Sequence, residues 1–174
     1  MTTELTDALR AVLDLQHQWT AVKTPAMDAR GELIRNRIPN LLRSLADECH
    51  FEVYGSAGAG SNNRVPWVRI FNPDFSPSPQ EGWYVVILFS TDGSAVYISL
   101  IQGTTDWAKG RGARRDPAVL LARSELARSL LRKSGLSVNG LLDNVQLNDP
   151  DLGKGYETGN RICDRVPFGR GSGR

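Results

Sequence analysis

The sequence predicts an α+β domain, in which helices pack against a curved and mainly antiparallel sheet. Three observations predict this class. Residues 5 to 46 carry apolar side chains at helical spacing, residues 51 to 101 contain four short runs rich in β-branched and aromatic residues, and another helical stretch follows. Strands that follow one another so closely pair antiparallel, because parallel pairing needs long crossover connections.

Three helices are expected around the sheet. Apolar residues recur every three or four positions from Leu5 to Trp19, which places them on one helical face. A second helical stretch runs from Asp28 to Ala46, where Pro39 either kinks the helix or opens a new one at its first turn. The third starts at Asp116-Pro117, a capping residue followed by a proline suited to the first turn, and ends near Gly135.

The four expected strands are separated by turn residues, and their sequences are FEVYG, PWVRIF, GWYVVILFS and AVYISLI. The Asp92-Gly93 pair between the last two is favoured in tight hairpins, so these two strands are expected to pair directly. One more strand is expected between Lys154 and Val166.

The chain has 174 residues, which suits one domain with a substantial core. We expect residues 1–168 to form this domain and residues 169–174 to be a flexible tail, or a linker to an effector domain elsewhere in a longer polypeptide. The formal net charge is only +2, so an argument for nucleic-acid binding must come from where the positive charges cluster.

Several classes of protein are disfavoured by the sequence. No apolar run approaches the roughly 20 residues of a membrane span, and the N-terminus is acidic and polar, so we expect a cytoplasmic protein without a signal peptide. Cys49 and Cys163 lie far apart without a CxxC pattern, which predicts buried thiols and no zinc site or disulfide.

No convincing catalytic constellation is visible, so we expect no catalytic residue, no metal site and no cofactor. His17 and His50 lack the neighbours of a triad or a metal site. Asp74 and Glu81 come near the carboxylate pattern of metal-dependent nucleases, but Trp83 stands where a lysine is needed, and the two carboxylates are better explained as part of a polar loop. No glycine pattern for binding nucleotide phosphates is present.

Two loops are candidates for contacting DNA. The sequence DWAKGRGARRD packs Lys109, Arg111, Arg114 and Arg115 closely after Trp107, and such cations can contact successive phosphates. The alternative is a solvated loop without a partner. The second loop, GSAGAGSNNRVPW, contributes polar side chains that can lie along a DNA backbone or enter a groove. These side chains are Ser61, Asn62, Asn63 and Arg64.

The stretch from Gly55 to Thr105 resembles the N-terminal DNA-binding domain of McrB-like modification-dependent restriction enzymes. The shared features, in order, are a glycine-rich loop, Pro66-Trp67, GWYVVILFS and AVYISLIQGTT, and the later GYETGN segment is also similar. The resemblance covers most of the chain and is strongest from residue 55 to residue 105. No single motif is highly specific, but their common order makes chance agreement improbable.

The resemblance implies a module that binds duplex DNA carrying modified cytosine, 5-methyl or 5-hydroxymethyl, and turns the modified base out of the helix, while other domains cut the DNA. It implies that Trp67, Tyr84 and Leu88 line the base pocket. Alternation along a strand places Tyr84 and Leu88 on one side and Val85 and Ile87 on the other. A tryptophan, a tyrosine and a leucine supply stacking and apolar contact for a methylated base. Without the resemblance, an ordinary sheet core explains the same residues.

The sequence departs from the family pattern at two points. Around Ala59, where relatives place a bulky residue that fills the gap left by the base, only small residues stand. Either Asn62, Asn63 or Arg64 fills the gap, or the base is handled differently. A further pocket aromatic is absent near Leu152. The rival hypothesis is a non-enzymatic protein-docking module whose basic loop meets an acidic partner, and a concealed enzyme is the third alternative.

Overall fold

A computed structural model describes residues 2–46, 50–58, 61–106, 113–137, 141–142, 145–148 and 162–166. For residues 45, 46, 106 and 114 it describes the backbone alone. The elements, in chain order, are α1 (Thr3–Gln16), α2 (Pro25–Glu32), the π-helical turn η1 (Leu33–Arg37), α3 (Ile38–Ala46), β1 (Glu52–Ser56), β2 (Trp67–Phe71), β3 (Trp83–Phe89), β4 (Val96–Gln102), β5 (Thr105–Asp106), β6 (Ala113–Arg114), α4 (Pro117–Lys133) and β7 (Cys163–Arg165).

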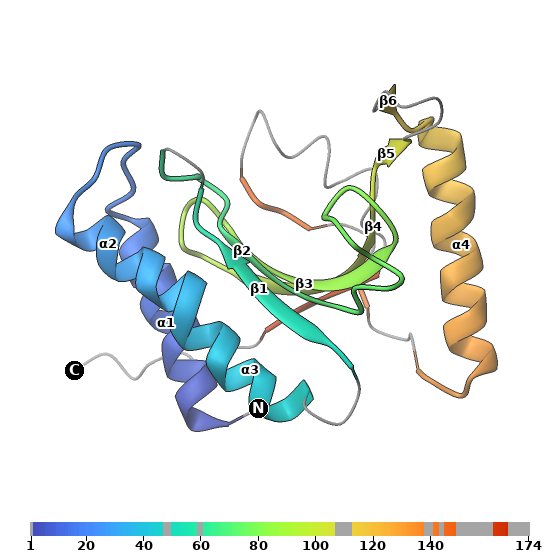
Figure 1. The fold of residues 1–174 in the computed structure, drawn as a ribbon, viewed down its shortest axis with the longest axis horizontal. Helices are drawn as coiled ribbons and strands as arrows, with labels where there is room; N and C mark the ends of the chain where they lie inside the picture. Colours follow the sequence, from blue (N-terminus) through green and yellow to red (C-terminus); the bar gives the residue numbers. More distant parts are fainter. Residues whose placement is uncertain are drawn as a thin grey trace.

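The main sheet has five strands in the order β1-β2-β3-β4-β7, and every neighbouring pair is antiparallel. It curves through the centre of the molecule, with α1, α2 and α3 on one side and α4 near its other end (Figure 1). The predicted α+β class is therefore confirmed, as is the direct pairing of the two strands around Asp92-Gly93. The strand expected within residues 154–166 is present as β7, and residues 154–161 lie outside the described part.

One face of the sheet packs against the N-terminal helices. Val68, Ile87 and Phe89 from the central strands are buried in one cluster with apolar side chains of α1, η1 and α3. The helical members of this cluster recur at three- and four-residue spacing, as the sequence predicts. They include Leu5, Leu9, Val12, Ile34, Ile38 and Leu42.

The second helical stretch begins three residues earlier than expected, because Thr24 caps it and Pro25 occupies its first position. The Thr24 hydroxyl accepts a hydrogen bond from the Met27 amide at 3.2 Å. The stretch then widens into η1 directly before Pro39, which has no amide to donate and whose ring crowds the preceding turn. Pro39 therefore lies at the second position of α3, with the widened turn immediately before it.

The first helix is shorter than predicted, since it ends at Gln16 and leaves Trp19 outside. The indole of Trp19 donates a hydrogen bond to the backbone carbonyl of Asn63 at 3.2 Å, so this side chain serves a loop contact and not the helical face. Further along, β1 crosses η1 at Gly55, where a Cβ atom would lie 1.8 Å from the carbonyl oxygen of Ile34. Only glycine permits so close an approach.

We call the opposite side of the sheet the aromatic face, because Tyr54, Trp67, Phe71, Tyr84 and Tyr97 belong to it. All but Tyr54 lie in or against a second buried cluster, and Tyr54 contacts Trp67. The cluster also includes Cys163 of β7, whose thiol is buried, as expected for this cysteine, and donates a hydrogen bond to the Leu142 carbonyl at 3.2 Å. Cys49 lies outside the described residues.

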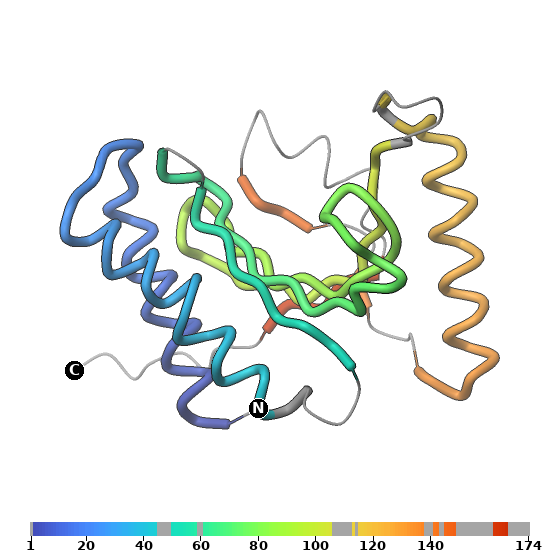
Figure 2. The backbone as a smooth tube through the Cα atoms, in the orientation of Figure 1, coloured from blue at the N-terminus to red at the C-terminus, as the bar shows by residue number. Residues whose placement is uncertain are grey.

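A short segment, residues 145–148, covers part of the aromatic face and is visible as the orange piece above the strands in Figure 2. Val145 and Leu147 are buried in the second cluster. The hydroxyl of Thr91 donates to the carbonyls of Leu147 and Asn148, and the amide of Asn148 donates to Asp92 at 2.7 Å. The β3–β4 hairpin therefore holds this segment in place.

The last described helix, α4, is attached through the end of β4. The side-chain amide of Gln102 donates to the Leu120 carbonyl at 2.7 Å and to the Ser124 hydroxyl at 3.0 Å, and all three groups are buried. Asp116 caps the helix by accepting from the Ala118 amide, as predicted. None of the helices in the described ranges has the length and apolar character needed to cross a membrane.

The hairpin carboxylate of Asp92 gives the stability of this fold a testable dependence on pH. Burial alone would raise its pKa, but hydrogen bonds from Ser90, Ser94 and Asn148 together lower the pKa to about 2. A lowered pKa stabilises the folded state at neutral pH, and that stabilisation disappears as the pH falls from about 4 to about 2.

We therefore expect Asp92→Asn to lower the melting temperature at pH 7 by roughly 1–3 °C, because the site is largely exposed and its electrostatics are screened. The difference from wild type should shrink below pH 4 in thermal unfolding followed by circular dichroism. Asp14→Asn on the exposed side of α1 is the control. A difference that is constant from pH 7 to pH 2 would contradict this role of the carboxylate.

Candidate nucleic-acid interface

The structure brings the three pocket residues implied by the resemblance to the same face of two paired strands. Trp67 of β2 is the register partner of Leu88 of β3. Tyr84, Val86 and Leu88 share the buried cluster of the aromatic face, while Ile87 belongs to the cluster under the helices. The predicted alternation of β3 is thereby confirmed.

The three residues differ in accessibility. Leu88 is fully buried and Tyr84 is 7% exposed. The hydroxyl of Tyr84 donates a hydrogen bond to the Pro79 carbonyl at 2.8 Å. Trp67 is only partly buried and lies against Tyr54 of the edge strand β1, with ring centroids 5.9 Å apart and planes tilted by 52°. Tyr54 is 56% exposed, so this pair is the accessible end of the aromatic face.

The centre of the aromatic face contains a charged residue that the sequence analysis did not single out. Arg69 of β2 lies two residues from Trp67 and two from Phe71, and its register partner is Val86. Its guanidinium carbon is 3.5 Å from the centroid of the Phe71 ring and 5.7 Å from that of Tyr84. Burial lowers its pKa, which the neighbouring Tyr84 and Glu52 partly offset. The sequence could have indicated this position, because Arg69 is two residues from an aromatic on either side and alternate residues of a strand share a face.

The polar loop before β2 is fixed to the helices by a buried arginine. The Arg30 guanidinium donates to the side chain of Gln16 and, at 2.9 Å, to the backbone carbonyl of Asn63. Gln16 in turn donates to the carbonyls of Arg64 and Ser90, at 2.8 and 3.3 Å. Burial, and secondarily the charge of Arg35, lowers the pKa of Arg30 to about 10, so it is still a cation at neutral pH.

These contacts divide the four candidate residues of the loop into two kinds. The Asn62 amide donates to backbone carbonyls of residues 20 to 22, and Asn63 Oδ1 accepts from the Val65 amide, so both side chains hold the loop together. Ser61 and Arg64 are exposed. The guanidinium of Arg64 lies 4.7 Å from the centroid of the Trp19 ring.

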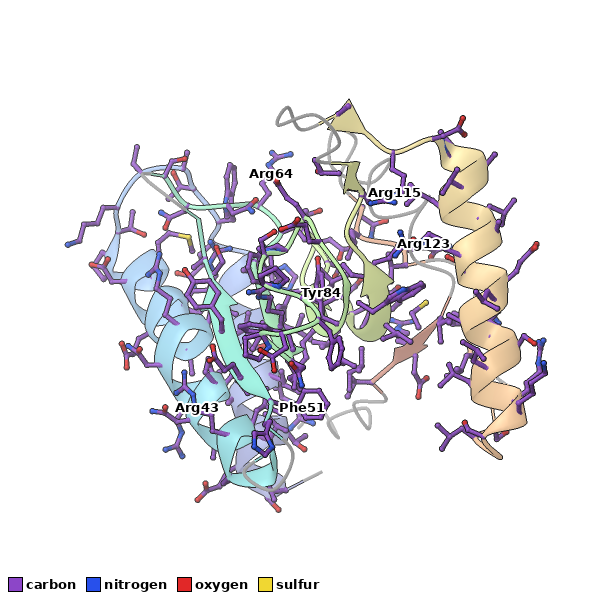
Figure 3. All side chains as sticks on the ribbon, turned by 45° about the vertical axis from the view of Figure 1, so that its right-hand side comes forward. Arg43, Phe51, Arg64, Tyr84, Arg115 and Arg123 are labelled. Carbon is purple, nitrogen blue, oxygen red and sulfur yellow. The ribbon has the colours of Figure 1, made fainter. Side chains whose placement is uncertain are left out.

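A second basic group lies beside α4. Arg115 donates to the Thr105 carbonyl at 3.1 Å, which joins the end of the basic loop to the strand before it. Burial, and secondarily the positive charge of Arg115, lowers the pKa of Arg123. The guanidinium carbon of Arg123 lies 6.0 Å from the centroid of the Trp83 ring. In Figure 3, Arg64, Arg115 and Arg123 lie along the upper side of the molecule, above Tyr84. Arg123 was missed because helix arginines usually face solvent.

The rest of the predicted basic loop lies outside the described structure. Lys109 and Arg111 belong to residues that are not described, and Arg114 is described only by its backbone in the β5–β6 pair. Among the described residues there is no group of three or more His, Cys, Asp or Glu side chains that would hold a metal ion. Asp74 and Glu81 lie in the connection between β2 and β3.

A family model for the MrcB-like N-terminal domain matches residues 14–165. The chain belongs to this family. The match includes all the strands and α2 to α4, and it confirms the resemblance read from the Pro66-Trp67 and GWYVVILFS stretches. Membership implies DNA binding and a place in a McrB-type restriction system, with no catalytic role for this domain. No curated protein and no solved structure matches the chain significantly.

The role of Arg30 in fixing the loop can be tested by Arg30→Met, which keeps much of the volume but removes the donors. We expect the free energy of unfolding to fall by roughly 2–3 kcal/mol, since Gln16 and the Asn63 carbonyl lose a buried partner. Urea denaturation measures this.

The matched control is Arg37→Met, because Arg37 is exposed and its ion pair with Glu4 at 3.5 Å joins two exposed side chains. Its effect should stay within about 0.5 kcal/mol. Equal stability of the two variants would show that the buried hydrogen bonds do not support the fold.

Proposed function

We propose that this domain recognises modified cytosine in duplex DNA, 5-methyl or 5-hydroxymethyl, and turns the base out of the helix onto the aromatic face. Cleavage would belong to an effector domain elsewhere in the same polypeptide or in a partner chain. The observation that carries the proposal is an aromatic face with one accessible end, in a chain of the MrcB-like N-terminal domain family.

The accessible end of the face suits a planar ligand. Trp67 is partly buried and therefore held in place, and Tyr54 beside it presents more than half of its surface to solvent. Extruding a base costs a few kcal/mol, and stacking on an aromatic side chain returns about 1–3 kcal/mol.

The arginines along one side of the molecule suit the phosphate backbone. Arg64, Arg115 and Arg123 come from three different segments, and each phosphate they neutralise releases condensed counterions. We propose that the neighbouring Lys109, Arg111 and Arg114 extend this surface, together with Ser61. The side chains of Asn62 and Asn63 are engaged in holding the loop, so their contribution to DNA contacts would come mainly through the backbone.

The difference between engaged and exposed side chains also bears on which residue could fill the gap that a flipped base leaves in the duplex. Of the three candidates around the glycine-rich loop, Arg64 has an exposed side chain that is long and planar at its end. Its guanidinium already lies over the Trp19 ring, which is the kind of contact that a base stack also offers. We propose Arg64 as the residue that enters the gap.

The central test is binding of the purified domain to matched duplexes with unmodified, 5-methylated or 5-hydroxymethylated cytosine at one fixed salt concentration. We expect a preference for a modified duplex, and we expect Trp67→Ala to remove it with a loss of roughly 10-fold to 100-fold in affinity. Fluorescence anisotropy measures the affinities, and circular dichroism checks that the variant is folded.

The control is Phe51→Ala, since Phe51 is an exposed aromatic at the lower end of the molecule, away from Arg64, Arg115 and Arg123 (Figure 3). Equal weak binding of all duplexes by the wild-type domain would refute base recognition. It would favour the rival docking module, for which exposed Val119, Leu126 and Leu130 of α4 offer an apolar surface.

Arg123→Ala tests the proposed backbone contact separately from base recognition. We expect it to weaken binding of modified and unmodified duplexes by the same factor, and to reduce the slope of log K against log salt by about 1. The exposed Arg37→Ala serves as the control, with an unchanged slope. A loss confined to modified duplexes would mean that Arg123 contacts the base and not a phosphate.

A further inference from the structure

The middle of the aromatic face has an unusual chemistry for a site that only stacks bases. Along β2, Trp67, Arg69 and Phe71 follow one another on this face. Across the pairing with β3, Trp67 lies opposite Leu88 and Arg69 lies opposite Val86. The guanidinium of Arg69 lies over the Phe71 ring, with its carbon 3.5 Å from that centroid and 5.7 Å from the centroid of Tyr84.

This guanidinium is buried without sufficient hydrogen bonds. Arg69 is 5% exposed, and its Nε and Nη1 atoms have no hydrogen-bond partner among the residues that the structure describes. The faces of the Phe71 and Tyr84 rings stabilise the charge in part, but ring faces do not replace the oxygen acceptors that the two donors lack. Buried donors left unpaired destabilise a fold, so an apolar residue at this position would leave the free protein at least as stable.

The other deeply buried arginine shows how such a side chain is accommodated when its role is structural. Arg30 is fully buried and donates to Gln16 and to the Asn63 carbonyl, which connects α2, α1 and the polar loop. Among the described residues, Arg30 leaves only its Nε without a hydrogen-bond partner, whereas Arg69 leaves both Nε and Nη1 without one. The contrast indicates that the unpaired donors of Arg69 are available to bind a group that is absent from the free protein.

We infer that Arg69 is a specificity-determining residue that donates hydrogen bonds to an oxygen or nitrogen acceptor of the base bound on the aromatic face. The inference rests on the proposed function, and it adds a hydrogen-bond donor to the residues that stack on the base. A cytosine derivative offers such acceptors at two places, its ring edge with O2 and N3, and an oxygen-bearing group on C5. A charged donor in a buried site discriminates strongly, because a ligand without the acceptor leaves it unpaired.

The test is Arg69→Met, which keeps a long unbranched side chain but removes every donor. We expect the melting temperature to stay the same or rise, while the affinity for the preferred modified duplex falls about 10-fold to 100-fold. Binding of unmodified duplex through the phosphate backbone should remain. Arg30→Met, measured alongside, should have the opposite effect on stability, a lower melting temperature. The exposed Arg37→Met is the control, and its melting temperature and its affinity should both stay close to those of wild type.

Affinities are measured well below the melting temperature on samples with native circular dichroism, so that stability and binding are separate readouts. If Arg69→Met does not fold, Arg69→Gln carries the same comparison. An Arg69 variant that binds every modified duplex as tightly as wild type does overturns the inference. So does a variant that loses stability as Arg30→Met does and binds normally when folded.

The two sources of the acceptor are distinguished by duplexes with 5-methyl, 5-hydroxymethyl and 5-carboxyl cytosine. Arg69→Met should weaken all three by the same factor if it donates to the ring edge. It should leave the 5-methyl duplex unaffected and weaken the oxygenated ones if it donates to the substituent. A wild-type domain that binds every duplex equally overturns the proposed function and this inference with it, whereas a wild-type preference that survives the substitution overturns the inference alone.

Discussion

The antiparallel register of β2 on β3 is the constraint on which the other features of the domain depend. Because β3 is buried on both faces, a shift of this strand by one residue would turn Tyr84, Val86 and Leu88 toward the helices in place of Ile87 and Phe89. The same register sets Trp67 opposite Leu88 and Arg69 opposite Val86. The helix-packed core and the candidate site therefore lie on opposite faces of the same strand pair.

The surrounding segments hold that sheet and its loops by hydrogen bonds between residues far apart in the sequence. Arg30 and Gln16 fix the polar loop next to Trp67, Gln102 attaches α4 to the end of β4, and Asp92 and Thr91 attach residues 145–148 to the β3–β4 hairpin. These anchors come from every part of the described chain and converge on the sheet. They bring cations from separate segments to one side of the molecule while the aromatic face stays in place.

A rigid aromatic face with an unsatisfied cation implies a compromise between stability and recognition. Trp67 and Tyr84 contribute to the core as well as to the proposed site, so the apolar part of the site favours folding. Arg69 works against it, because its buried Nε and Nη1 have no hydrogen-bond partner within the described part of the chain. Local disagreement of this kind between sequence and fold is characteristic of binding sites, where an unfavourable free-state arrangement is relieved by the ligand.

By itself, the sequence determined the α+β class, the five strands of the main sheet, the Asp92-Gly93 hairpin and the family, because period-two and period-3.6 patterns and turn residues are local signals. It also placed Tyr84 and Leu88 on one face. It did not predict the short β5–β6 pair at the ends of the basic loop. It did not determine where α1 ends, and it did not reveal the buried environment of Arg69 or that Arg123 lies near Arg115. Nor did it separate Asn62, whose side chain holds the loop, from the exposed Arg64. Those features depend on which distant segments meet, as when Trp19 contacts Asn63 or Phe71 lies under Arg69, and only the tertiary structure decides such contacts.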